Sequence, residues 1–268
     1  MARRRRPKRK LSFAGWVLLC LLVVCVIVLV KVVKTKLNES QEVVKPTITN
    51  DVVEVTPTPT PEVVEQYDFD SGDSLLILAN KAHPLKEGYE PSDLVHLDGI
   101  YKTQDSWMLR KSCKEAVAEM FEAAKKDGVT LEVGSAYRSA AYQASLWQSY
   151  ANQYGADRAD RISSRPGHSD HQTGLCIDVV ENNGIMDGIN YCTEFEDSKS
   201  GKWLYEHAHE YGFILRYPKG KEDITGYSYE PWHYRYIGKD YATKMYEISP
   251  DLTFEEYFNV EGGKEYKE

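Results

Sequence analysis

The sequence predicts a globular domain of the α+β class behind an N-terminal membrane anchor. After residue 67, helical and extended patterns follow one another without a regular strand–helix–strand rhythm, which argues against a doubly wound parallel sheet. The 268 residues are 42% hydrophobic and 28% charged, which is enough apolar material for one large domain or two small ones. The chain also begins with a basic segment that runs into a long apolar stretch.

The N-terminal segment has the pattern of an uncleaved signal anchor. Seven of the first ten residues are basic, and residues 13–30 carry no charge. A helix of that length spans about 27 Å, close to the hydrocarbon thickness of a bilayer. Three lysines lie directly after it: Lys31, Lys34 and Lys36. The positive-inside rule therefore predicts a cytoplasmic tail over residues 1–10, a transmembrane anchor over residues 11–33 and an extracytoplasmic remainder.

The segment after the anchor has the composition of a linker. Thr, Pro, Val and Glu dominate residues 34–66, and the prolines alternate in TPTPTPE. Such a stretch favours extended polyproline-like geometry and cannot fill a core. We therefore expect a Thr/Pro-rich extracytoplasmic linker over residues 34–66 and a folded domain over residues 67–268.

The charge of the exported part excludes one class of function. Ten of the 33 basic residues lie in residues 1–37, which contain no acid. The rest of the chain has 23 basic and 41 acidic side chains, a net charge of −18. A nucleic-acid-binding domain needs clustered Lys and Arg for phosphate contacts, so this charge argues against one.

Helices and strands are expected from the spacing of the apolar residues. In residues 112–126 the apolar side chains recur at helical spacing, and Gly128 ends the helix. Ser139 is a plausible N-cap for a second helix that reaches residue 154. Further helices are expected over 203–211, which Gly212 stops, and over 239–248. Short strands are expected over 129–133, 175–180, 213–217 and 232–237.

Three cysteines lie in the exported part: Cys113, Cys176 and Cys192. Because the number is odd, at most one internal disulfide forms and one thiol remains. The spacing does not select the pair, and it does not match a Cys-rich zinc site.

The first of two candidate metal-binding clusters spans residues 163–178. Gly174 marks a close turn, and the strand after it places Asp178 on the same face as Cys176. A carboxylate within an apolar strand is costly unless it is paired or metal-bound. His171 lies in the preceding turn and can fold back toward that face.

The second cluster spans residues 229–236, where His233 and Arg235 share one face of a strand. Pro231 suggests an edge or a bend, which would let Glu230 and His233 approach one centre. The two imidazoles and the aspartate of the two clusters form a three-ligand set suited to Zn²⁺, with one position left for water. A further acid nearby could act as a base.

These motifs resemble a known family. The pattern S-x-H-x-x-G-x-x-x-D (residues 169–178) and the pattern E-P-W-H-x-R-Y (residues 230–236) are similar to those of the VanY-type D-alanyl-D-alanine carboxypeptidases of the M15B zinc metallopeptidase family. The segments ILANKAHPL, YEPSDLV, SAYRSAAYQ and YGFILRYP extend the resemblance over about residues 74–240. It implies the zinc peptidase fold shared with the Hedgehog signalling domain, an α+β sheet that cradles the metal.

The resemblance also implies roles for individual residues. Three positions match the zinc ligands: His171, Asp178 and His233. Glu230 matches the catalytic base, and Arg138 matches an arginine that binds or stabilises the oxyanion. Three more resemble residues near the terminal carboxylate of the substrate: Gln143, Ser163 and Ser169. The chain departs from the family where Tyr, Glu and Ala are common, at His168, Asp170 and Cys176, and His168 could compete as a ligand.

The implied activity is removal of the terminal D-alanine from pentapeptide stems of peptidoglycan, by an enzyme anchored in the bacterial cell membrane and facing the wall. The same centre could instead act as an L,D-carboxypeptidase on tetrapeptide stems, because the ligands do not distinguish the two substrates. An endopeptidase that opens crosslinks is a weaker alternative. A non-catalytic wall-binding module is the alternative from a different class, and it would be expected to lack a ligand or Glu230.

Overall fold

The computed structural model describes residues 67–181 and 193–267. The expected tail, anchor and linker, as well as Cys192, lie outside these residues. Within the described part, no helix is long and apolar enough to cross a membrane. Cys113 and Cys176 are both buried and free.

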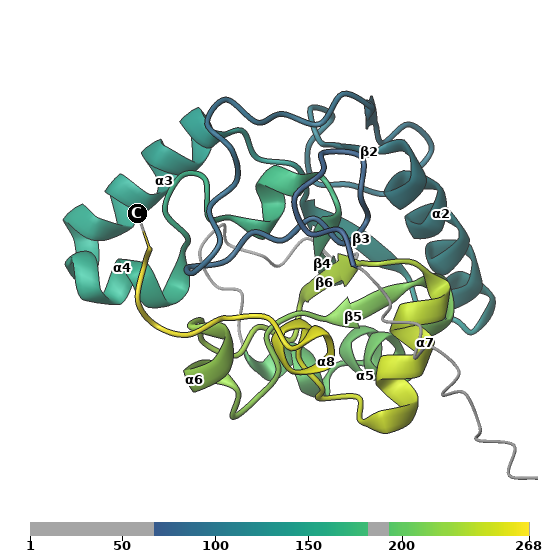
Figure 1. Ribbon diagram of the computed structural model, residues 1–268. Helices are drawn as coiled ribbons and strands as arrows, with labels where there is room; N and C mark the ends of the chain where they lie inside the picture. Colours follow the sequence, from purple (N-terminus) through teal and green to yellow (C-terminus); the bar gives the residue numbers. More distant parts are fainter. Residues whose placement is uncertain (1–66, 182–192, 268) are drawn as a thin grey trace, which may run out of the picture. The chain divides into compact units, whose positions relative to one another are not determined.

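Helices and short strands mix in the order expected of an α+β domain (Figure 1). The strands are β1 (Leu94–His96), β2 (Met108–Arg110), β3 (Leu131–Ser135), β4 (Cys176–Glu181), β5 (Phe213–Leu215) and β6 (His233–Tyr236). The α-helices are α2 (Lys111–Lys126), α3 (Ala140–Tyr154), α4 (Ala156–Ile162), α5 (Lys199–His207), α6 (Glu222–Thr225), α7 (Lys239–Ile248) and α8 (Phe254–Phe258). Three 3₁₀ turns complete them: η1 (Asp170–Thr173), η2 (Thr193–Asp197) and η3 (Ala208–Tyr211).

The main sheet has the order β3-β4-β6-β5, with every neighbouring pair antiparallel. The two central strands, β4 and β6, carry the two predicted clusters. Their register sets Asp178 directly opposite His233 and Cys176 opposite Arg235. Strands β1 and β2 form a separate antiparallel hairpin.

The two faces of this sheet differ in chemistry because side chains alternate along each strand. Ile177 and Val179 of β4, with Tyr234 of β6, enter the main hydrophobic core with the apolar side of α2. Asp178 and His233 therefore occupy the opposite face. In Figure 1, α2 and the α3–α4 pair lie on opposite sides of the sheet.

The expected helices and strands are found with small shifts at their ends. Ser139 caps α3 as predicted, since its side chain accepts a hydrogen bond of 3.2 Å from the Tyr142 N–H. The helix expected over 203–211 begins earlier, at Lys199, because Ser198 caps it, and it ends in the 3₁₀ turn η3. The strand expected over 129–133 lies two residues later.

Gly174 is required at the junction of η1 and β4. Its φ of 68° is in the left-handed region, where a residue with a side chain is strained. A Cβ there would also come within 3.1 Å of Arg110 and Leu94. The glycine thus lets the chain turn from His171 directly into the strand that carries Asp178.

Candidate metal centre and active site

His171 lies in η1 with one ring nitrogen already committed. Its Nδ1 donates a hydrogen bond of 2.7 Å to the carbonyl oxygen of Ala136. This bond commits Nδ1 as a donor and makes Nε2 the nitrogen that can bind a metal. Nε2 is buried and has no hydrogen-bond partner, and it lies 3.2 Å from Oδ2 of Asp178. An orphaned imidazole nitrogen beside a carboxylate is the environment a metal ion would satisfy.

Asp178 lies between the two imidazoles. Its Oδ1 is 3.0 Å from Nδ1 of His233, while its Oδ2 faces His171. Burial raises the pKa of Asp178, but the imidazoles of His171 and His233 outweigh it and hold that pKa well below its ordinary value. The carboxylate is therefore ionised at neutral pH, as a metal ligand must be.

His233 directs Nδ1 toward Asp178, whereas His171 directs Nε2 toward it, and the buried ion pair of Asp170 and Arg235 explains the difference. Its Nε2 donates to Oδ2 of Asp170 at 3.3 Å, which leaves Nδ1 facing Asp178. Asp170 in turn pairs with Nη1 of Arg235, whose Nη2 donates to the backbone oxygens of Leu75 and Ile77 at 3.0 and 2.6 Å. This aspartate thus orients a candidate ligand, a role that the sequence analysis missed. Its signals in the sequence were its place next to His171 and its position where the family commonly has Glu.

Both imidazoles hold protons strongly when no cation is bound. Burial and Arg138 lower the pKa of His171, but Asp178 and Cys176 raise it further, to about 9. The pKa of His233 lies well above its ordinary value, because Cys176, Asp170 and Asp178 outweigh the effect of burial. The negative charges that hold these protons also attract a divalent cation, which must displace the protons to bind.

The donor set fits zinc. Nε2 of His171, Nδ1 of His233 and the Asp178 carboxylate converge from η1, β6 and β4, and all three side chains are buried. Two nitrogen ligands and one oxygen ligand leave the fourth tetrahedral position for water or substrate. In addition, Asp178, Glu230 and His233 offer ligand atoms within 4.8 Å of one another.

Cys176 lies against the same imidazoles. Ligand atoms of His171, Cys176 and His233 fall within 4.8 Å of one another, and Cys176 is fully buried. The sequence analysis placed Cys176 on the same strand face as Asp178 but gave it no role.

Glu230 is the acid beside this centre. It precedes β6, and the turn after it is closed by a 3.1 Å bond from the His233 N–H to the Glu230 carbonyl. Oε2 of Glu230 is consequently 3.5 Å from Nδ1 of His233, which the bend expected at Pro231 makes feasible. Burial raises the pKa of Glu230, and although His233 opposes this effect the value reaches about 7. A carboxylate with that pKa can both accept and return a proton near neutral pH.

A cavity of about 310 Å³ opens over the centre. Its wall includes the candidate ligands and the acid together with the side chains Arg138, Tyr150, Tyr154, Arg158, Ser163, Ser169, Tyr217, Tyr227, Tyr229 and Trp232. Nε of Arg138 is buried without a hydrogen-bond partner, so this guanidinium has a donor available for a ligand. Helix α3 supplies Tyr150 and Tyr154, and α4 supplies Arg158.

Of the three residues expected near the substrate carboxylate, two line the cavity and one lies outside its wall. Ser163 and Ser169 line the cavity. Gln143 does not line it. Its Nε2 donates to Oγ of Ser163 at 3.0 Å and to the carbonyl oxygen of Ser164 at 2.8 Å. Gln143 therefore supports Ser163 from behind.

His168 is directed away from the metal ligands. Its Nδ1 donates to the carbonyl oxygen of Asn80 at 2.8 Å, and its ring meets the edge of Tyr266. The suggestion that it competes as a ligand has no support in this geometry.

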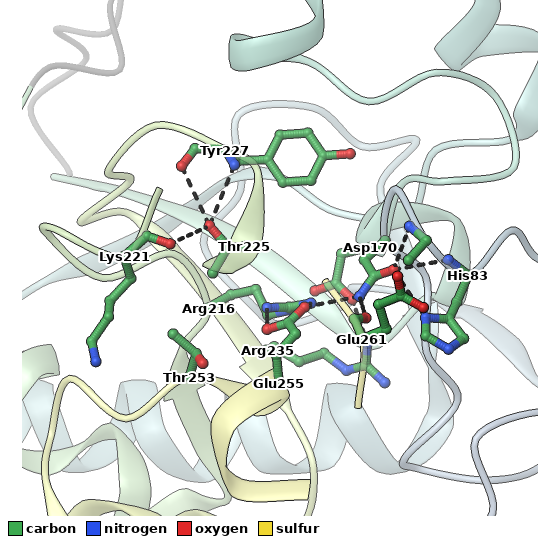
Figure 2. Close-up of polar contacts among 12 residues, drawn as sticks. His83, Asp170, Arg216, Lys221, Thr225, Tyr227, Arg235, Thr253, Glu255 and Glu261 are labelled. Atoms are coloured by element: carbon green, nitrogen blue, oxygen red, sulfur yellow. Dashed lines mark hydrogen bonds and ion pairs between the residues drawn. The ribbon is translucent and has the colours of Figure 1, made fainter. Parts of the chain in front are cut away.

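A second buried ion pair lies beneath the centre. Arg216, which follows β5, donates two hydrogen bonds of 2.8 and 2.7 Å to the Glu255 carboxylate of α8 (Figure 2). Asn80 donates a third to the same carboxylate, at 3.0 Å. Because both charges are buried, the bidentate geometry and the extra donor are needed to offset desolvation. The pair joins β5 to the C-terminal helix.

Comparisons with known proteins agree with this site. The family model for D-alanyl-D-alanine carboxypeptidase, VanY, matches residues 106–239. Among curated proteins, the putative carboxypeptidase YodJ of Bacillus subtilis (strain 168) is 41% identical over 189 residues, covering 69% of this chain and 67% of that protein.

Solved structures are similar as well. The structure of the LdcB LD-carboxypeptidase has a TM-score of 0.63 at 40% identity, covering 70% of this chain and 87% of that one. A mutant of the vancomycin-resistance D,D-pentapeptidase VanY in complex with Zn(II) has a TM-score of 0.57 at 34% identity, covering 69% and 99%.

Proposed function

The chain belongs to the VanY family and is a zinc metallocarboxypeptidase, and on this premise we propose that it removes the terminal D-alanine from pentapeptide stems of peptidoglycan. One observation carries the proposal. Two imidazole nitrogens and a carboxylate converge at the floor of a cavity, with Glu230 beside them and the Arg138 guanidinium in the same wall.

The proposed ligands are His171, Asp178 and His233. A zinc ion held by them would act as a Lewis acid on a carbonyl group and would lower the pKa of a bound water to about 7. Glu230 takes the proton from the attacking water and later delivers it to the leaving amine. Its pKa of about 7 without the metal suits both transfers, although a bound cation lowers the value.

Arg138 supplies a cationic donor on the substrate side. Its unpartnered Nε can stabilise the negative charge that develops on the carbonyl oxygen of the cleaved peptide bond. Its planar guanidinium group also suits the terminal carboxylate of the substrate. Ser163 and Ser169 add hydroxyl groups to the same wall, and Gln143 holds Ser163 in place. Together these groups recognise the end of a peptide.

Support for the D,D specificity comes from the VanY family model and from the similarity to a D,D-pentapeptidase. A second candidate is L,D-carboxypeptidase activity on tetrapeptide stems. The observation that favours it is the likeness to the LD-carboxypeptidase LdcB, which has the higher identity and TM-score of the two solved structures.

We further propose that residues 11–33 anchor the enzyme in the cell membrane with its N-terminus in the cytoplasm. Residues 34–66 then act as the extracytoplasmic linker. The basic N-terminus and the uncharged apolar run support this orientation, which places the site among peptidoglycan stems.

Mass spectrometry of synthetic stems tests the proposed function. The zinc-loaded protein is incubated separately with a pentapeptide and a tetrapeptide stem, and loss of one alanine mass from the pentapeptide is expected. Preferential loss from the tetrapeptide would support the second candidate instead. Unchanged masses for both stems, with zinc confirmed bound, would refute the enzymatic proposal.

The variant Glu230→Gln tests the base. We expect it to bind zinc normally and to lose about 100- to 10,000-fold in rate, the usual contribution of general acid–base catalysis. Glu119→Gln, at an exposed position on α2, is the matched control and should keep full activity. Full activity in Glu230→Gln would remove this residue from the mechanism.

A further inference from the structure

The fully buried thiol of Cys176 forms a second donor set with the two imidazoles. Cys176 is two residues before Asp178 on β4, so both side chains lie on the sheet face that carries His233. Ligand atoms of His171, Cys176 and His233 fall within 4.8 Å of one another. Nε2 of His171, itself buried, has no hydrogen-bond partner.

The two donor sets share both imidazoles and differ in the third ligand. With Asp178, the set is two nitrogens and an oxygen, which suits zinc with an open position. With Cys176, it is two nitrogens and a sulfur, and a thiolate favours soft ions such as Cd²⁺ over the borderline-soft Zn²⁺. A single centre therefore offers a choice between a carboxylate and a thiol.

We propose that His171, Cys176 and His233 bind a soft, thiophilic metal ion in a mode that excludes zinc from the catalytic arrangement. Binding forms a metal–sulfur bond and releases the thiol proton to solvent. The two modes are mutually exclusive because each uses the same two imidazoles. A soft ion held against Cys176 does not need the Asp178 carboxylate. Glu230 then has no zinc-activated water from which to take a proton, so the protein in this mode is inactive.

Access to this site is through the catalytic cavity. His171 and His233 line the cavity, whereas Cys176 lies behind them and is 0% exposed. A metal ion can therefore reach the sulfur only past the imidazoles, and zinc already bound there blocks its path.

Cadmium is a suitable probe because it is soft and has one stable oxidation state. Cd²⁺ is titrated into the metal-free full-length protein while the ultraviolet thiolate-to-cadmium charge-transfer band is recorded. We expect the band in the wild type and its loss in Cys176→Ala. Cadmium affinity should fall by about 10- to 100-fold or more in this variant, since mutation even of outer groups around a metal lowers its affinity by that factor. Zinc affinity should change much less than cadmium affinity in this variant.

Cys113→Ala is the matched control. Cys113 is the other fully buried free thiol of the described residues, on α2, and it does not join the metal-ligating group. This variant should keep the band. Cys176→Ser serves if the alanine variant does not fold. Equal cadmium affinity in the wild type and the Cys176 variants, or no band in the wild type at saturation, would overturn the proposal. These readouts do not depend on peptide hydrolysis, so failure of the proposed function would be seen separately.

Discussion

Replacing Asp170 by Asn tests whether the buried network behind His233 positions this ligand. Asp170 is 1% exposed, accepts from Nε2 of His233 at 3.3 Å and pairs with Arg235. Asparagine keeps the size and one oxygen acceptor but removes the charge. The single remaining oxygen can accept from His233 or from Arg235 but not from both, as the two carboxylate oxygens do. The hold on Nε2 of His233 is therefore weakened, and Arg235 stays buried without a counter-charge.

Two effects of different size are expected from this change. Loss of an outer partner of a zinc-binding histidine lowers metal affinity by about 10- to 100-fold. At about 1.4 kcal/mol for each factor of ten, this corresponds to about 1.4–2.8 kcal/mol of binding free energy. Leaving Arg235 unpaired lowers the free energy of unfolding by about 3–5 kcal/mol, because its guanidinium is fully buried.

The two effects are measured separately. Zinc affinity is obtained by competition with a chromophoric chelator under conditions where the variant is folded, and stability by urea denaturation of the metal-free protein. Glu119→Gln, which weakens an exposed pair with Lys239, is the control and should change neither quantity appreciably. Wild-type zinc affinity in folded Asp170→Asn would refute the positioning role of Asp170.

Three other outcomes are expected. Zinc affinity should rise from neutral pH and level off above about 9, because the metal must displace the proton that His171 holds below this pKa, and a flat competition profile would contradict the assignment. Glu255→Ala should lower the free energy of unfolding by about 3–5 kcal/mol, because it leaves Arg216 buried and unpaired, and a loss below about 1 kcal/mol in urea denaturation would be inconsistent with that pairing. Arg138→Ala should lower kcat/KM by about 100- to 1,000-fold at saturating zinc, and steady-state kinetics with unaltered kcat/KM would exclude it from transition-state stabilisation.

The sequence predicted the long helices and the central strands because their patterns are local. The apolar spacing of α2 and the Ser139 cap of α3 each depend on residues within a few positions of one another. The hairpin of β1 and β2 was not predicted, and each of its strands has three residues. The helices α6 and α8, with four and five residues, were also missed.

The candidate site was predicted in part. The side chains expected around the metal do converge, because the antiparallel register sets Asp178 opposite His233 and η1 turns His171 toward them. The supporting groups were not predictable in the same way. Asp170 and His233 are 63 residues apart, and no local pattern indicates that they share a hydrogen bond.

By itself the sequence determined the kinds of ligand, the acid beside them and the family, since those are properties of residue types at fixed spacings. The tertiary structure decided which nitrogen of each imidazole is left for a metal, because the other nitrogen donates a hydrogen bond to Ala136 in His171 and to Asp170 in His233. It also brought the Cys176 thiol against the same imidazoles. These contacts join segments distant in the chain, and only the packing of the whole sheet fixes their distances.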